Sequence, residues 1–135
     1  MSNIKTLAML MPVLLLAGTA DAQQAPPTAQ VTSLMTKVLA DYPGKEATVI
    51  TVDYPPGGES PVHRHNAHAF VYVLQGSIVM GLRGGKLVTL TPGQTFYEGP
   101  DDVHTISRNA SLTEPAKFLV VLMKKTGAPI TTPVR

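Results

Sequence analysis

The sequence predicts an all-β protein built as a sandwich or a barrel. From residue 46 onward, short segments rich in β-branched and other apolar residues are separated by glycine, proline and other turn residues at close intervals. No long segment carries the 3.6-residue apolar repeat of an amphipathic helix. Many short strands with regular turn signals are typical of sandwiches and barrels, so this fold class is expected.

The first 22 residues are typical of an export signal. Lys5 is followed by an apolar stretch over residues 7–17 and then by Ala20-Asp21-Ala22, which has the small-x-small form of a cleavage site. The apolar stretch is too short, and interrupted by Pro12, for the roughly 20 residues of a membrane span. We therefore expect cleavage after Ala22, no stable membrane anchor, and a mature protein that is periplasmic or secreted.

Residues 23–45 are expected to form a flexible leader and an outer strand. Residues 23–30 are rich in glutamine, proline and alanine, a composition that does not form a packed element. Residues 31–40 are compatible with a short helix or with an outer strand, and we favour the strand.

Residues 46–124 are expected to form the folded domain, and residues 125–135 a C-terminal tail. Turns are predicted wherever glycine and proline cluster between the apolar segments. The predicted strands cover residues 46–53, 69–74, 77–82, 86–90, 95–98, 105–108 and 116–124.

The most distinctive chemical feature is His63-Arg64-His65, followed later in the chain by His104. Residues i and i+2 of an extended strand project to the same face, so His63 and His65 could bind one metal ion while His104 supplies a third nitrogen. Neutral imidazole is the commonest protein ligand for transition metals. Histidines near a strand end are also often merely packed or half exposed, so the pair alone leaves both interpretations open.

The residues around the first two histidines resemble the first motif of the cupin family. That motif consists of a glycine, five residues, His-x-His, a glutamate after three or four residues, and a second glycine after six more. Four residues of this sequence stand at its spacings: Gly57, His63, His65 and Gly76. The glutamate is absent, because its position is Ala69.

The residues around His104 are similar to the second cupin motif. Gly93 and His104 match its spacing, and Asn109 stands one residue later than the usual asparagine. Gly99 and Asp101 replace the usual proline and glycine. The two motifs together cover about residues 46–124 and imply a small jelly-roll β-barrel.

The resemblance implies a metal site with three histidine ligands: His63, His65 and His104. It would hold one divalent transition metal ion, Fe, Mn, Zn or Ni, with Fe favoured because similar three-histidine cupin sites activate dioxygen. Three neutral ligands leave the charge of the ion uncompensated and leave open positions for water, substrate or dioxygen. Four acids could instead reach the site from a loop: Glu59, Glu98, Asp101 and Asp102.

Two residues are candidates for catalysis. Glu98 ends an apolar strand and is equally compatible with an outward rim position and with a base beside the metal. Tyr54 stands at the strand end before the metal loop, although tyrosines are more often packed aromatics than catalysts.

Strand parity predicts which side chains share the interior with the histidines. If the strand from His63 continues in register, the inward residues are Ala69, Val71 and Val73. His68 then faces away and is not expected to bind the metal, unless a bulge reverses the parity. The outward residues Phe70, Tyr72 and Leu74 are also apolar, which predicts cover by a second sheet or by a partner chain, and makes a homodimer the expected assembly.

Composition excludes several kinds of chemistry. The chain has no cysteine, so disulfides, thiolate metal sites and cysteine nucleophiles are excluded. A formal net charge of +2 does not indicate a nucleic-acid partner.

Three functions remain open for a small-molecule site of this kind. The leading hypothesis is a dioxygenase-like enzyme that acts on a small polar organic molecule. A second is a metal-dependent isomerase or lyase on a sugar acid or carbonyl compound, with Glu98 or Tyr54 moving protons. A third is a non-catalytic binding or sensory module that uses the same pocket.

Overall fold

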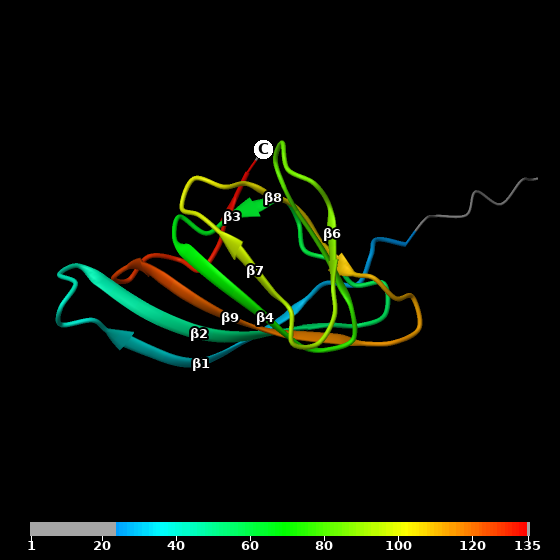
Figure 1. Ribbon diagram of the computed structural model, residues 1–135, viewed down its shortest axis with the longest axis horizontal. Helices are drawn as coiled ribbons and strands as arrows, with labels where there is room; N and C mark the ends of the chain where they lie inside the picture. The colour runs from blue at the N-terminus through cyan, green and yellow to red at the C-terminus, as the bar shows by residue number, and fades with distance from the viewer. Residues whose placement is uncertain (1–23, 135) are drawn as a thin grey trace, which may run out of the picture.

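The computed structural model describes residues 24–134, and this part of the chain consists of strands and loops, as expected for an all-β protein (Figure 1). The predicted export signal lies outside the described residues. Within the described part, no helix is long and apolar enough to span a membrane. The strands are β1 (Gln30–Val38), β2 (Lys45–Tyr54), β3 (His63–Arg64), β4 (His68–Gln75), β5 (Ile78–Leu82), β6 (Val88–Leu90), β7 (Thr95–Glu98), β8 (His104–Asn109), β9 (Ala116–Lys125) and β10 (Thr132–Pro133).

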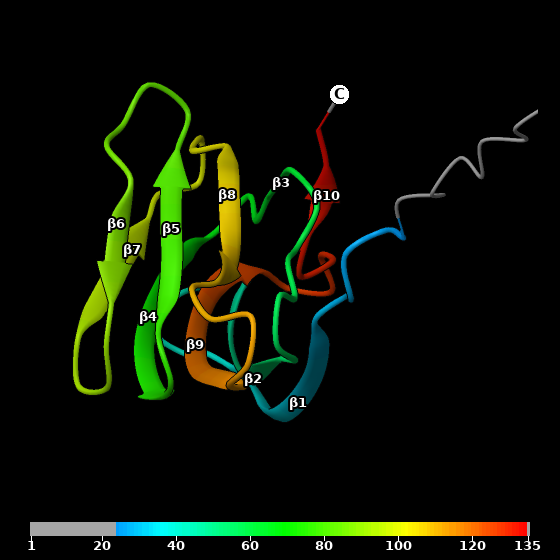
Figure 2. The ribbon, with the colours of Figure 1, turned by 90° about the vertical axis from the view of Figure 1, so that its right-hand side faces the viewer.

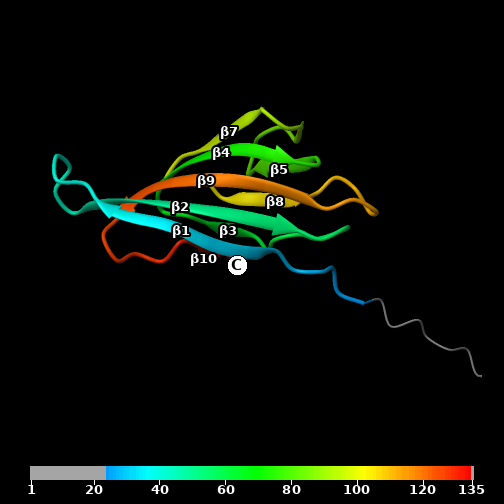
Figure 3. The ribbon, with the colours of Figure 1, turned by 90° about the horizontal axis from the view of Figure 1, so that it is seen from below.

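The strands form two five-stranded antiparallel sheets that face each other. The sheet with the longer strands, called the larger sheet below, has the order β1-β2-β9-β4-β7, and Figure 3 shows it from its outer side. The smaller sheet has the order β10-β3-β8-β5-β6 (Figure 2). This is the jelly-roll arrangement that the resemblance implied, although hydrogen bonds do not close the described strands into a barrel.

The core lies between the two sheets and follows from the two-residue period of the strands. Along β9, buried residues alternate with partly exposed ones, and Phe118, Val120 and Leu122 point inward. From the smaller sheet, Ile78 and Met80 face them and are fully buried. The larger sheet therefore supplies an apolar floor beneath the space between the layers.

The chain turns sharply between β3 and β4, so the strand that begins at His63 does not continue into β4. Asn66 has a φ of 50°, a left-handed conformation that asparagine tolerates better than most residues, and the strands on either side belong to different sheets. The expected parity is nevertheless correct. Burial alternates along β4, with Ala69, Val71 and Val73 inside.

Two short stretches of the smaller sheet also differ from expectation. His104 is the first residue of β8, not part of the preceding loop. Residues 132–133, expected to lie in a tail, form β10 and pair with β3, placing Pro133 opposite His63. A two-residue strand whose only partner is distant in sequence leaves no local pattern to read.

A buried ion pair holds the far ends of β2 and β9 together. Glu46 and Lys124 lie opposite each other in the register, are 7% and 4% exposed, and form an ion pair through Lys124 Nζ. The same ammonium donates a hydrogen bond to the carbonyl oxygen of Ala128 (2.6 Å), so it also fixes the start of the segment that leads to β10. The hydrogen bond from Lys124 lowers the pKa of Glu46, and its stabilising effect is lost as pH falls through that lowered pKa.

Gly76, the last glycine of the first motif, is required for two separate reasons. Its φ is +69°, and a Cβ at this position would overlap the carbonyl oxygen of Pro115 and lie 2.9 Å from the Cα of Ala116. Gly84 has a similar φ of +77°, but a Cβ there would meet nothing within 4 Å.

We expect Gly76→Ala to destabilise the protein more than Gly84→Ala. Both variants meet the left-handed penalty of roughly 1–2 kcal/mol, but only Gly76→Ala must also displace the backbone at Pro115. Urea unfolding of the two variants measures the difference. Equal losses would mean that the turn after β4 can move away from Pro115 without cost.

Candidate metal centre

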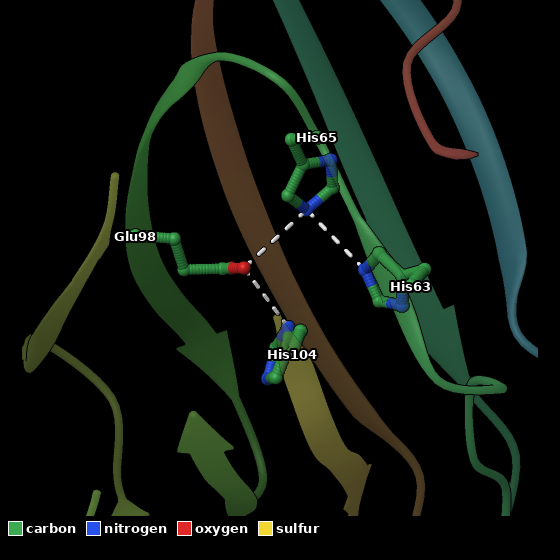
Figure 4. Close-up of side chains that lie close together, drawn as sticks. All are labelled: His63, His65, Glu98 and His104. Carbon is green, nitrogen blue, oxygen red and sulfur yellow. Dashed lines mark hydrogen bonds and ion pairs between the residues drawn. The ribbon is translucent and has the colours of Figure 1, made fainter. Parts of the chain in front are cut away.

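Four buried side chains converge between the two sheets: His63, His65, Glu98 and His104 (Figure 4). Each offers one ligand atom, and these atoms all lie within 4.8 Å of one another. His63 comes from β3, His65 from the turn that follows, Glu98 from the end of β7, and His104 from the start of β8. The structure therefore brings the three predicted histidines together and adds a carboxylate to them.

The hydrogen bonds of His63 and His65 set which ring nitrogen is free. His63 Nδ1 lies 2.8 Å from the carbonyl oxygen of Pro61, and His65 Nδ1 lies 2.7 Å from that of Ile130. A carbonyl oxygen can only accept, so each Nδ1 carries the hydrogen and each neutral ring presents a lone pair at Nε2. The two Nε2 atoms are 3.3 Å apart. Two lone pairs held this close repel each other unless a cation lies between them, so this geometry suits a shared metal ion.

Glu98 provides the acid that the first motif lacks. Its Oε2 lies 3.2 Å from His104 Nδ1 and 3.7 Å from His65 Nε2, and the residue is 3% exposed. An outward rim position is therefore ruled out. Glu98 is the register partner of Ala69, so the carboxylate comes from β7 instead of from the usual position on β4. The candidate site thus groups the three histidines with Glu98, one of the four acids that the sequence left open as further ligands.

His104 completes the cluster, and its ring nitrogens are the clearest sign that the site needs a bound ion. Its Cα lies opposite that of His63 in the pairing of β3 with β8. Both ring nitrogens are buried, and neither has a hydrogen-bond partner of acceptable geometry among the described residues. Buried polar atoms are nearly always paired, so a metal ion bound to this imidazole would satisfy an otherwise costly group.

The environment favours the metal-binding protonation state of two of these groups, His63 and Glu98. Burial lowers the pKa of His63, which keeps the ring neutral. Burial alone would raise the pKa of Glu98, but the interaction with His104 and the nearby His65 outweighs it, and the pKa falls. Neutral imidazoles and an ionised carboxylate are the forms that bind metals. Nitrogen and oxygen donors of this kind suit Fe, Mn, Zn and Ni alike.

The other candidate residues lie outside the cluster. Tyr54 is 1% exposed, and its hydroxyl lies 2.7 Å from Ser60 Oγ and 2.7 Å from Ser107 Oγ. His68 points to the outer surface and hydrogen-bonds with the Tyr97 hydroxyl at 2.7 Å, as its parity predicts.

The other three acids that could have reached the site, Glu59, Asp101 and Asp102, are not part of the cluster of ligand atoms. Asp102 accepts a hydrogen bond from the Gly99 N–H at 2.6 Å and so stabilises the turn after β7. Asp101 and Glu59 are exposed. Glu59 lies at the edge of the cavity beside the site.

A cavity of about 230 Å³ opens onto the four side chains. One wall is the inner face of β2 and β9, and residues near both ends of the described chain line it as well, among them Val31 and Ile130. The role of Ile130 could not be predicted from the sequence. Its carbonyl oxygen lies beside His65 because β10, which follows Ile130, pairs with β3.

Two facing antiparallel sheets around a buried histidine and carboxylate cluster define a β-sandwich with a candidate metal site. A model of the family described as "Cupin domain" matches residues 50–122, and the chain belongs to this family. No curated protein matches the sequence.

Solved structures similar to this chain share its fold. A cupin domain from Bordetella pertussis is 23% identical, with 75% of this chain and 98% of that chain covered and a TM-score of 0.58. An oxalate oxidase in complex with the substrate analogue glycolate is 26% identical, with 82% and 57% covered and a TM-score of 0.60. The DMSP lyase DddQ from Ruegeria pomeroyi is 19% identical, with 65% and 43% covered and a TM-score of 0.58. This chain thus spans only about half the length of the last two proteins.

We expect His65→Ala to lose most bound divalent metal and His68→Ala to keep it. His65 contributes a buried nitrogen to the cluster, whereas His68 lies on the outer face of β4. Elemental analysis of both purified variants after loading with Zn(II) measures the stoichiometry. Equal metal loss in the two variants would mean that the ion binds elsewhere.

Because Ala69 and Glu98 are cross-strand partners, the carboxylate can be transferred from β7 to β4 by substitution. Glu98→Gln should weaken Zn(II) binding by at least tenfold, because it removes the negative charge beside the cation. Adding Ala69→Glu to Glu98→Ala should restore part of that affinity, because the two positions are opposite each other in the register. Competition titration with a chelating dye measures both effects, and a double variant that binds no better than Glu98→Ala alone would contradict this placement.

Proposed function

We propose that the protein is a metal-dependent enzyme that acts on a small organic molecule with dioxygen, with Fe(II) as the working metal. The observation that carries this proposal is the buried cluster of three histidines and Glu98 at the wall of a cavity large enough for a substrate. A bound iron would supply a site where an organic ligand and dioxygen can meet. The role of the chain is to bind the ion, orient its ligands and exclude water around the reacting molecule.

The residues that line the cavity favour this chemistry over proton transfer. An isomerase or lyase needs a base within reach of the substrate, and Glu98 belongs to the metal cluster. Apart from the cluster, the titratable side chains of the described cavity lining are those of Tyr54 and Glu59. Burial raises the pKa of Tyr54, so it keeps its proton, and Glu59 is exposed. The comparisons do not choose between the classes, because they include both an oxidase and a lyase.

Oxygen uptake by the Fe(II)-loaded protein tests the proposal. The loaded protein is mixed with a panel of small enols, catechols and carboxylates, and dioxygen is followed with an electrode. Uptake above that of the protein alone should occur with at least one compound, disappear in His65→Ala and persist in His68→Ala. Turnover that proceeds equally well without dioxygen would instead indicate the isomerase or lyase, and binding without any turnover would indicate a sensory module.

We also propose that the protein is exported and forms a homodimer. Export is supported by residues 1–22 of the sequence, with cleavage after Ala22, and N-terminal sequencing of the protein from its native host would test it. The homodimer is supported by the outer face of the larger sheet, where large apolar side chains are 44–54% exposed. These side chains are Met35, Phe70, Tyr72, Leu74 and Tyr97.

The expected interface places Phe70 near its centre, because Phe70 packs against Tyr97 and pairs with Val121 in the register. Phe70→Glu should therefore convert a dimer into a monomer, since it would bury a charge without a partner. Leu112→Glu is the matched control, because Leu112 is 84% exposed and lies outside the sheet. Sedimentation of the two variants and the parent measures the mass, and a parent that sediments as a monomer would refute the dimer.

A further inference from the structure

The cavity beside the metal cluster has an apolar wall. Its floor is the inner face of the larger sheet, formed by Ile50 and Val52 from β2 and by Phe118 and Val120 from β9. Val31 and Ile130 line it from the two terminal segments. A molecule that reaches the cluster must lie against these hydrocarbon surfaces.

Three hydroxyl groups of the lining, those of Tyr54, Ser60 and Ser107, are already hydrogen-bonded to one another. The Tyr54 hydroxyl lies within hydrogen-bond distance of Ser60 Oγ, of Ser107 Oγ and of the Ser107 carbonyl oxygen, at 2.7, 2.7 and 3.1 Å. The described lining contains no lysine, arginine, asparagine or glutamine. The remaining hydroxyls of the described lining are those of Thr28 and Thr131. A substrate with many hydroxyl groups or a second charge would therefore lose its water and gain few partners.

The net charge of the metal-loaded cluster determines which charge the metal-binding group of the substrate should carry. A dication contributes +2, Glu98 contributes −1 and the histidines are neutral, so the sum is 2 − 1 = +1. One negative oxygen donor would neutralise the site. A dianion would leave an excess negative charge in a buried place where the described lining has no cationic side chain to balance it.

The cavity has room for an organic body beside the cluster. Its volume of about 230 Å³ exceeds the about 150 Å³ of an apolar cavity known to bind benzene. One ring with a short substituent therefore fits, provided that its polar part faces the cluster.

We infer that the site takes a monoanionic molecule that binds the metal through oxygen and carries an apolar body about the size of one ring. This inference rests on the proposed metal-dependent function and replaces the expectation of a small polar molecule. The expected substrate differs from oxalate and glycolate, because these two-carbon molecules have no apolar body to contact the wall.

Binding of hydroxamates to the Zn(II)-loaded protein tests the inference without requiring turnover. Hydroxamates bind zinc through oxygen as monoanions, and three of them share this head: benzohydroxamate has a phenyl body, acetohydroxamate a methyl group, and succinic monohydroxamate a free carboxylate. Calorimetry should show benzohydroxamate binding at least tenfold more tightly than acetohydroxamate, with the succinic compound weakest. Equal affinities, or preference for the succinic compound, would overturn the inference while leaving the metal site intact. Failure of the protein to load zinc would instead refute the proposed function.

A pair of variants locates the apolar body in the cavity. Val31→Ser combined with Ile130→Ser should reduce the preference for benzohydroxamate over acetohydroxamate severalfold, because both side chains line the cavity. The backbone carbonyl that accepts from His65 is retained in this variant, and zinc stoichiometry checks that the ligands are intact. Val38→Ser is the control, since Val38 is on the same strand as Val31, is similarly exposed (58% against 52%) and does not line the cavity. An unchanged preference in the double variant would show that the body binds elsewhere.

Discussion

Two imidazole nitrogens, His63 Nε2 and His65 Nε2, lie 3.3 Å apart, and each ring is oriented by a hydrogen bond from its Nδ1 to a backbone carbonyl oxygen. Pro61 precedes His63 by two residues, but Ile130 lies 65 residues beyond His65. That segment is held in place by β10, which pairs with β3, and by Lys124, which donates to Ala128. Lys124 also forms the buried ion pair with Glu46, so the segment that contains Ile130 is connected to the paired ends of β2 and β9.

Burial determines the chemistry of the cluster and of its surroundings. Without a cation, the interior would contain an ionised Glu98, two facing lone pairs and a His104 ring that makes no hydrogen bond of acceptable geometry with the described residues, and each of these is costly in an apolar environment. A single dication relieves all three at once. The apolar wall of Ile50, Val120 and their neighbours then strengthens the electrostatic interactions inside the site, because it keeps water away.

The sequence was sufficient for the fold class and for the three histidines, because both leave local signals in the spacing of turns and of His-x-His. The parity inferred along β4 is also correct, even though the chain turns at Asn66 between β3 and β4. The position of Glu98 could not be derived, since it depends on which residue of β7 lies opposite Ala69. Parity along β7 offered a partial signal, but the strand register arises only from packing. The contribution of Ile130 was invisible for the same reason, because a backbone carbonyl has no signature in the sequence.

The pairing of Ala69 with Glu98 has an evolutionary consequence. Adjacent positions on neighbouring strands point into the same space, so two substitutions are enough to transfer the acid from one strand to the other. The intermediate on such a path carries either two carboxylates or none. Two buried carboxylates side by side repel each other, and a bound cation reduces that repulsion. A lineage that remained loaded with metal could therefore pass through the two-acid intermediate, whereas a lineage short of metal would have to pass through a form with no acid at all.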